Sequence, residues 1–335
     1  MLNGHGDDLH LIEGEITHNF SSNVYYKGCP EALLDDISRN INLIQSYPSP
    51  TASELNELAA KKFQLNNEQF LFTNGATEAF YLIAQLYSDK KAVIVAPTFS
   101  EYEDACKIFQ LEYQLISRAE IKDTSADLIF ICNPNNPNGA IFSKSELELF
   151  LQQKPETIFV IDEAYIEFTN SIESIVSLTK KYKNLIVVRS LTKTFTIPGL
   201  RLGYVISNAS LITKLLNLKM PWSVNLLAIR AGEYIFNNYE TLQFNASLLL
   251  EETTTFKKEL AQLKGIKVCE SNTSYFLVEL LHTSAKELKE YLIEKHQILI
   301  RDATNFNNLE GEFIRLSTQS KEANDTLITA LKAWI

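Results

Sequence analysis

The strongest chemical signal in the sequence surrounds Lys193, in the segment Ser190-Leu-Thr-Lys-Thr-Phe-Thr-Ile-Pro-Gly-Leu-Arg201-Leu-Gly-Tyr, which follows an apolar run at Leu185–Val188. A lysine at the carboxyl end of a buried strand can hold an aldehyde cofactor as a Schiff base. Ser190, Thr192 and Arg201 supply two hydroxyls and a guanidinium group, which suit a phosphate dianion. Most isolated lysines are simply solvated, but that interpretation leaves the rest of this segment unexplained.

A second segment, Phe159-Val-Ile-Asp162-Glu-Ala-Tyr165, ends another apolar run. A carboxylate at a buried strand end needs a partner, because its desolvation is costly. A protonated pyridine nitrogen would be such a partner, and Asp162 would keep that nitrogen charged so that the ring can accept electrons. Tyr165 could hydrogen-bond the ring's phenolic oxygen. An Asp-Glu pair also occurs in the magnesium sites of ATPases, but the sequence contains no GxxxxGK[ST] motif.

Two turn-rich segments follow two further apolar runs: Asn133-Pro-Asn-Asn136-Pro-Asn-Gly139 and Thr73-Asn-Gly75-Ala76-Thr77-Glu-Ala. The composition of the first predicts only a tight turn, yet its place at a strand end makes Asn136 a candidate donor to the same ring oxygen. In the second, a strand turns into a helix. The backbone N–H groups of Gly75, Ala76 and Thr77 would begin that helix and bind the cofactor phosphate.

The elements that must position these residues alternate along the chain. Helical patterns separate short apolar runs at Gln69–Thr73, Ala92–Ala96, Tyr113–Ile116, Asp127–Cys132, Thr157–Asp162, Asn184–Arg189 and Gly203–Ile206. This alternation predicts an α/β fold with a mostly parallel seven-stranded sheet and helices on both faces. Ligands of such folds bind at the carboxyl ends of the strands. We expect residues 40–225 to form this large domain, and residues 1–39 and 226–335 to form a smaller α+β domain.

The composition of the 335 residues is that of an ordinary globular protein, 45% hydrophobic and 21% charged. The net charge of −10 disfavours nucleic acid or an anionic membrane as a partner. Four scattered cysteines without a CxxC pair are typical of reduced thiols in a cytoplasmic protein, and they form no metal-ligand pattern with the five histidines. The polar, acidic N-terminus predicts no signal peptide, and no run of about 18 apolar residues predicts a membrane span.

Together the four segments closely resemble those of class I and II aminotransferases, pyridoxal-phosphate enzymes of fold type I. The resemblance runs from about Tyr47 to the C-terminus and implies pyridoxal 5'-phosphate as the cofactor. It makes Lys193 the Schiff-base lysine and Asp162 the partner of the pyridine nitrogen. The remaining cofactor contacts that it implies are Tyr165 and Asn136 on the ring oxygen, and Ser190, Thr192, Arg201 and the turn at Gly75–Thr77 on the phosphate.

Three further residues match the family in other segments of the chain. Tyr102, in Pro97-Thr-Phe-Ser-Glu-Tyr102, corresponds to the aromatic residue that stacks on the ring. Arg315, in Phe-Ile-Arg315-Leu, corresponds to the arginine that binds the substrate α-carboxylate. Tyr47 corresponds to a tyrosine that reaches the cofactor phosphate of the partner subunit, which implies a homodimer with active sites at its interface.

Two branches of the family fit the chain best, the histidinol-phosphate aminotransferases and the threonine-phosphate decarboxylases. Three segments resemble the decarboxylases: Pro221-Trp-Ser-Val-Asn225, Arg301-Asp-Ala-Thr-Asn305-Phe, and His5-Gly6 followed by Phe20-Ser-Ser-Asn23. In that branch, N-terminal residues and a nearby arginine help to hold the substrate phosphate, which implies roles for His5, Asn23 and Arg301.

The N-terminal segment also departs from that branch. Asp7 and Asp8 stand where the decarboxylases favour glycine and asparagine, and two aspartates near a phosphate would be unfavourable unless they point away. We therefore predict aminotransferase chemistry on a small phosphorylated amino acid or amine, with decarboxylation of L-threonine O-3-phosphate as the alternative. A non-enzymatic regulator is a remote alternative, because only about 46 residues precede Tyr47, too few for a DNA-binding domain and a linker.

Overall fold

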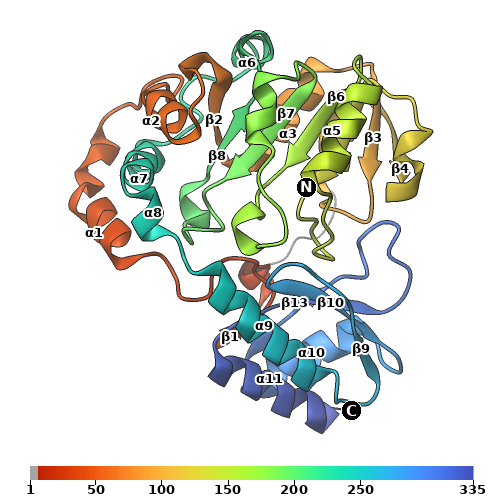
Figure 1. Cartoon of the computed structure of the whole chain (residues 1–335). Coiled ribbons are helices and arrows are strands. Elements are labelled where there is room, and N and C mark those ends of the chain that lie inside the picture. Colours follow the sequence, from red (N-terminus) through yellow and green to blue (C-terminus); the bar gives the residue numbers. More distant parts are fainter. Residues whose placement is uncertain (1–6, 335) are drawn as a thin grey trace.

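Seven strands form the main sheet of the computed structural model, which describes residues 7–334 (Figure 1). Their order is β2-β8-β7-β6-β5-β3-β4, and β8 alone runs antiparallel to its neighbours. The mostly parallel seven-stranded sheet predicted from the sequence is therefore confirmed. The bounds are β2 (Phe70–Asn74), β3 (Lys91–Val95), β4 (Glu112–Ile116), β5 (Leu128–Cys132), β6 (Ile158–Asp162), β7 (Leu185–Ser190) and β8 (Leu202–Ile206).

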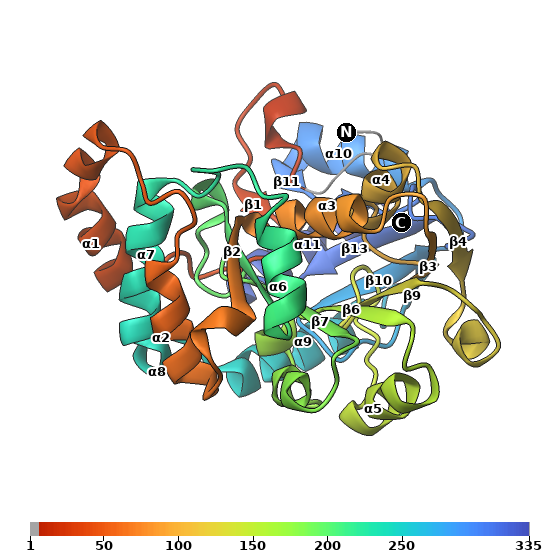
Figure 2. The ribbon, with the colours of Figure 1, turned by 90° about the horizontal axis from the view of Figure 1, so that it is seen from above.

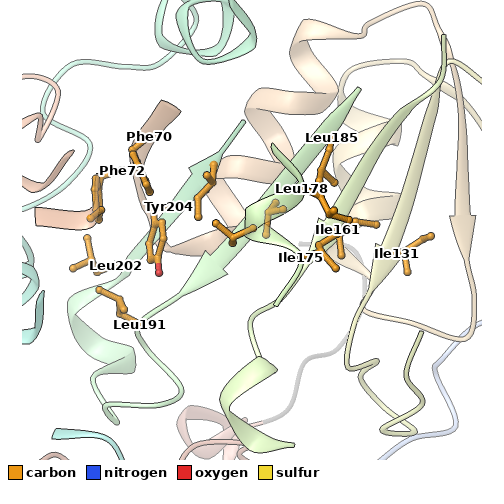
Figure 3. Packing of buried hydrophobic residues seen from close by; sticks show 14 of the residues in the cluster. Phe70, Phe72, Ile131, Ile161, Ile175, Leu178, Leu185, Leu191, Leu202 and Tyr204 are labelled. Carbon is orange, nitrogen blue, oxygen red and sulfur yellow. The ribbon is translucent and has the colours of Figure 1, made fainter. Parts of the chain in front are cut away.

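Helices cover both faces of this sheet, which explains why its central strands are apolar at nearly every position. On one face pack α3 (Gly75–Leu86), α4 (Glu101–Ile108) and α6 (Ala209–Leu216). On the other pack α2 (Glu54–Phe63), α5 (Lys144–Gln153) and α7 (Leu226–Asn237). Successive residues alternate between the two cores, as in β5, where Phe130 faces the first and Ile131 the second. Figure 3 shows part of the second core, including Phe72, Ile161 and Tyr204.

A four-stranded antiparallel sheet, in the order β12-β13-β10-β9, forms the smaller α+β domain below the main sheet in Figure 1. Its elements are β9 (Ile266–Val268), β10 (Tyr275–Leu280), β12 (Arg301–Asp302) and β13 (Phe313–Ser317), with α9 (Ala246–Leu260), α10 (Ala285–His296) and α11 (Lys321–Trp334). The N-terminal segment joins this domain, because β1 (His18–Asn19) pairs in parallel with β11 (Ile298–Leu299). Phe20 then lies in the core of the small domain.

The helices that directly follow residue 225 continue to pack against the core of the main sheet. α7 packs against α1 (Glu31–Arg39) and α2, and its Ile229 shares the core of the main sheet with Leu33 of α1. Gly232 allows this close approach, since a Cβ there would lie 3.0 Å from side-chain atoms of Leu55 and Leu202. Figure 2 shows α1, α2 and α7 together beside β2, at the end of the sheet away from β4. These helices, with the short α8 (Tyr239–Leu242), thus belong to the large domain.

None of the helices within residues 7–334 is long and apolar enough to cross a membrane. The same part of the chain contains no group of three or more histidine, cysteine, aspartate or glutamate side chains placed to hold a metal ion.

Candidate active site

A cavity of about 220 Å³ lies where the carboxyl ends of β5, β6 and β7 meet the small domain and the N-terminal segment. The large domain contributes the ends of these strands and the start of α3, which line one wall. We call this the cofactor wall, formed by Ala76, Thr77, Asn136, Asp162, Tyr165, Ser190, Thr192, Lys193 and Arg201. The opposite side, which we call the substrate wall, is formed by Asp7, Ser21, Ser22, Asn23, Arg301, Asn305 and Arg315.

Lys193 follows β7 by three residues and projects into the cavity. Removal from water lowers the pKa of its amine to about 8, and the nearby charges of Arg315 and Arg201 add to this effect, whereas Asp7 and Asp162 oppose it. A substantial fraction of the amine is therefore neutral near physiological pH. A neutral, partly desolvated lysine is the nucleophile that Schiff-base chemistry requires.

Asp162 ends β6 and is 4% exposed. Its Oδ2 accepts a hydrogen bond from the Tyr102 hydroxyl at 2.5 Å, and its Oδ1 accepts one from the Ala164 backbone N–H at 2.9 Å. Burial raises the pKa of Asp162 to about 6, although both hydrogen bonds and the charge of Lys193 lower it in part. A carboxylate in this position is best stabilised by a cationic partner in the cavity.

The N-terminus of α3 and Arg201 form an anion-binding corner of the cofactor wall. Gly75 has a φ of +74°, and a Cβ there would lie 2.5 Å from Nη2 of Arg201, so only glycine lets the guanidinium group cover the start of the helix. Gly203 is required as well, since its Cβ would lie 2.5 Å from the backbone nitrogen of Ala76. The hydroxyls of Ser190 and Thr192, 2.7 Å apart, complete the corner. Helix N–H groups, hydroxyls and a guanidinium together suit a phosphate.

Two arginines face each other on the substrate wall. Arg301 of β12 and Arg315 of β13 are directly opposed in the antiparallel pair, and both line the cavity. Burial lowers the pKa of both guanidinium groups, and burial together with the charge of Arg315 lowers that of Arg301 to about 10. Because like charges in a buried space repel, this pair favours an anionic ligand.

Their existing contacts hold the two arginines in place. Arg315 donates to Oδ1 of Asn136 and, at 2.5 Å, to the backbone oxygen of Ser21, while its Nε has no hydrogen-bond partner within residues 7–334. Arg301 donates to Oδ1 of Asn305 at 2.7 Å and to the backbone oxygen of Asp302. Arg315 therefore links the cofactor wall, through Asn136, to the N-terminal segment.

The two aspartates of the N-terminal segment have different positions. Asp8 does not line the cavity, and the Lys289 amine donates to its Oδ2 at 2.5 Å, but its charge still acts on Arg301 and raises the pKa of that guanidinium group. Asp7 lines the cavity, where its Oδ1 accepts from Nδ2 of Asn19 at 2.6 Å. Only one of the two negative charges therefore lies on the substrate wall. His5, which the sequence suggested as a substrate contact, lies outside the described residues.

Asn23 and Tyr165 lie close together in the cavity. Asn23 is 3% exposed, and its amide makes no hydrogen bond of normal geometry within the described chain. It is nevertheless close enough to the Tyr165 hydroxyl to lower the pKa of that group slightly, against a burial effect that raises it to about 12. Tyr165 therefore remains a neutral donor, as a hydrogen bond to a ring oxygen requires.

Tyr102 does not line the cavity, although the family resemblance implied that it would stack on the cofactor ring. Its ring is fully buried behind the cavity, stacked on Phe130 with centroids 5.3 Å apart, and its hydroxyl points to Asp162. Phe99, three residues earlier in the same segment, lines the cavity instead. The reason is that Tyr102 lies in the first turn of α4 and packs into the core between the helices and the sheet, whereas Phe99 precedes the helix. The turn Pro97-Thr-Phe99 after β3 was the signal that could have identified it.

Tyr47 is absent from the lining of this chain's cavity. Its side chain is 88% exposed and packs on Trp222, with ring centroids 5.9 Å apart. Its expected contact is with a partner subunit, so that contact stays a prediction. Sequence reasoning also missed Cys132, which ends a strand run without a signal of its own, and it did not single out Asn305 within the Arg301–Phe306 segment that resembles the decarboxylases; both line the cavity.

The side chains of the cofactor wall fit pyridoxal phosphate. An amine can bind its aldehyde, a buried carboxylate can pair with its pyridinium nitrogen, and the corner at Gly75 and Arg201 can hold its phosphate. The two glycines, whose Cβ atoms would fill the corner, are the observation that best supports this fit.

Comparisons with known proteins agree with this chemistry. Residues 15–331 match the family model for aminotransferase class I and II. A histidinol-phosphate aminotransferase from Caldanaerobacter subterraneus is 31% identical over 89% of this chain and 87% of its own length. Threonine-phosphate decarboxylase from Salmonella typhimurium is 29% identical over 94% of this chain and 90% of its own. The crystal structure of L-threonine-O-3-phosphate decarboxylase from Porphyromonas gingivalis superposes with a TM-score of 0.91 and 35% identity, covering 95% of this chain and 99% of that one.

Proposed function

The chain belongs to the class I and II aminotransferase family, whose enzymes depend on pyridoxal phosphate, and from that premise we propose that it decarboxylates a small amino acid carrying a phosphate group. L-Threonine O-3-phosphate is the substrate to test first. The observation that carries the proposal is the opposed pair of Arg301 and Arg315 on the substrate wall.

An amino acid phosphate carries two anionic groups near its α-carbon, a carboxylate and a phosphate. It would therefore bring one anionic group to each of the two buried guanidinium groups. Histidinol phosphate carries only a phosphate, so it would bring an anionic group to only one of the two guanidinium groups. Asp8 is paired with Lys289 outside the cavity lining, so of the two aspartates only Asp7 would lie directly beside the substrate.

The residues of the chain then have separate tasks. When bound, the cofactor supplies an electron-accepting ring. Asp162 holds the proton on the ring nitrogen, and Tyr165 and Asn136 orient the ring through its phenolic oxygen. Arg315 and Arg301 hold the carboxylate and the phosphate of the substrate. As the bond between the α-carbon and the carboxylate breaks and CO₂ leaves, the Lys193 ammonium returns a proton to the α-carbon.

Transamination of a phosphorylated amine, as predicted from the sequence, is the second candidate. The same two arginines would suit a dicarboxylate acceptor such as 2-oxoglutarate, and a histidinol-phosphate aminotransferase is among the relatives. In that reaction Lys193 would move a proton between the substrate α-carbon and the cofactor, and no carbon would be lost.

The holoenzyme incubated with L-threonine O-3-phosphate and no keto acid separates the two reactions. Mass spectrometry should detect aminopropanol phosphate formed over many turnovers, in equal amount to the CO₂ released. A parallel reaction with histidinol phosphate and 2-oxoglutarate should produce no glutamate. Glutamate formation there, without aminopropanol phosphate in the first reaction, would replace decarboxylation by transamination.

We also propose that the protein acts as a homodimer. Tyr47, Ile44, Met220 and Trp222 are all more than half exposed, and Tyr47 packs on Trp222, so apolar side chains gather on this surface. Light scattering coupled to size-exclusion chromatography should give twice the chain mass of 38.0 kDa. A species of the single-chain mass at micromolar concentration would exclude the dimer.

A further inference from the structure

Tyr102 and Asp162 form a buried pair behind the cofactor wall. We propose that Tyr102 is a positioning residue that keeps Asp162 ionised, and so keeps the proton on the pyridine nitrogen of the cofactor. The Tyr102 hydroxyl donates to Oδ2 of Asp162 at 2.5 Å. The inference rests on pyridoxal phosphate as the cofactor and holds for either of the two reactions above.

The aromatic surroundings of Tyr102 fix its hydroxyl in this position. Its ring is 0% exposed, stacks on Phe130 at an interplanar angle of 11°, and meets the rings of Phe80 and Phe99 edge-on at centroid distances of 4.8 and 5.8 Å. Burial, followed by the charge of Asp162, raises the pKa of the phenol well above its ordinary value. The hydroxyl therefore remains a donor to the carboxylate.

The groups that face Asp162 come from four neighbouring segments. They are the Tyr102 hydroxyl on α4, Sγ of Cys132 on β5 at 3.9 Å, the Ala164 N–H after β6 and the Lys193 amine after β7. Within the described part of the chain, the cation whose charge lowers the pKa of Asp162 is Lys193, which is also the group that must react with the cofactor aldehyde. The Tyr102 and Ala164 hydrogen bonds remain available to the carboxylate whatever Lys193 is doing.

Whether the shared proton lies on Asp162 or on the ring nitrogen depends on the balance between burial of the carboxylate and the hydrogen bonds that it accepts. Burial alone would favour a neutral Asp162, and a neutral acid would face an unprotonated pyridine, which accepts electrons poorly. Hydrogen bonds to the ionised form favour the carboxylate and therefore leave the proton on the ring nitrogen. Removing the Tyr102 hydroxyl should move the proton from the ring toward Asp162.

Tyr102→Phe tests this directly, because it removes one oxygen and keeps the ring that packs between Phe80 and Phe130. Tyr204→Phe is a matched control. Tyr204 is also fully buried, it lies in the core on the other face of the sheet, and its hydroxyl has no hydrogen-bond partner within the described chain.

The readout is the ¹⁵N NMR shift of bound pyridoxal phosphate labelled at the ring nitrogen. We expect a protonated nitrogen in the wild type and in Tyr204→Phe, and a shift toward the unprotonated form in Tyr102→Phe. An unchanged shift in Tyr102→Phe would overturn the proposal.

A second measurement separates this role from simple packing. The apoprotein binds either pyridoxal phosphate or its 1-deaza analogue, which has a carbon in place of the ring nitrogen. Tyr102→Phe should weaken the binding of pyridoxal phosphate about tenfold or more, as expected for a hydrogen bond to a charged group, and should weaken the analogue far less. Equal weakening of both would show that Tyr102 acts only through packing. Neither measurement involves turnover, so failure of the substrate assignment would leave both results unchanged.

Discussion

The cofactor wall consists of the ends of neighbouring strands in one sheet, whereas the substrate wall is assembled from the N-terminal segment and the β12–β13 pair of the small domain. Parallel strands that are hydrogen-bonded to one another fix the relative positions of Asp162 and Lys193. On the substrate wall, the position of Asp7 depends instead on side-chain hydrogen bonds within a segment that has little regular structure. We therefore propose that the rigid wall determines the type of chemistry and that the assembled wall determines the substrate.

Replacing Lys193 by alanine tests the cofactor wall and should have the largest effect. Loss of both the nucleophile and the proton-transfer group should lower kcat about a thousand- to ten-thousand-fold. Lys183→Ala is the control, since Lys183 is an exposed lysine just before the same strand, at its opposite end. Turnover by the purified variants is the measurement, with thermal unfolding to show that both fold. Full activity in Lys193→Ala would remove the lysine from the mechanism.

The same contrast explains how much could be predicted from the sequence. The strands of the main sheet were predictable because apolar runs and helical patterns alternate. Asp162 and Lys193 were predictable because the first ends such a run and the second follows one by three residues. The direction in which Tyr102 points was not predictable, because it depends on where α4 begins relative to the sheet. The opposition of Arg301 and Arg315 depends on strand register across a 14-residue separation, which no local pattern encodes.

Replacing Arg301 by glutamine tests the substrate wall. Because the guanidinium group is 8% exposed and would pair with the substrate, its loss should lower kcat/KM for L-threonine O-3-phosphate about thirty- to a thousand-fold. The affinity of the apoprotein for pyridoxal phosphate should not change, since Arg301 lies on the opposite wall. A fall in cofactor affinity comparable to the fall in kcat/KM would show that the two walls are not separable.

The pH dependence of cofactor capture should reveal how strongly the surroundings alter Lys193. Since only the neutral amine attacks the aldehyde and the pKa of Lys193 is lowered to about 8, the capture rate should rise about tenfold from pH 7 to pH 9 and then level off. A lysine with an ordinary pKa would instead show a continuing rise beyond pH 9. Stopped-flow absorbance after mixing apoprotein with pyridoxal phosphate measures the rate at each pH.

Replacing Asp7 by asparagine tests whether the substrate wall reaches across to the cofactor wall, and its effect should be the smallest. The charge of Asp7 raises the pKa of Lys193, so its removal should lower that pKa and increase the neutral fraction of the amine at pH 7. We expect the capture rate at pH 7 to rise about threefold and its pH midpoint to fall.

Asp8→Asn is the matched control, because the Asp8 carboxylate contacts Lys289 and does not line the cavity. The midpoint is the decisive measurement, because a gain in rate from weaker repulsion of the cofactor phosphate would leave it unchanged. If Asp7→Asn and Asp8→Asn share the wild-type midpoint, the charge of Asp7 does not act on Lys193.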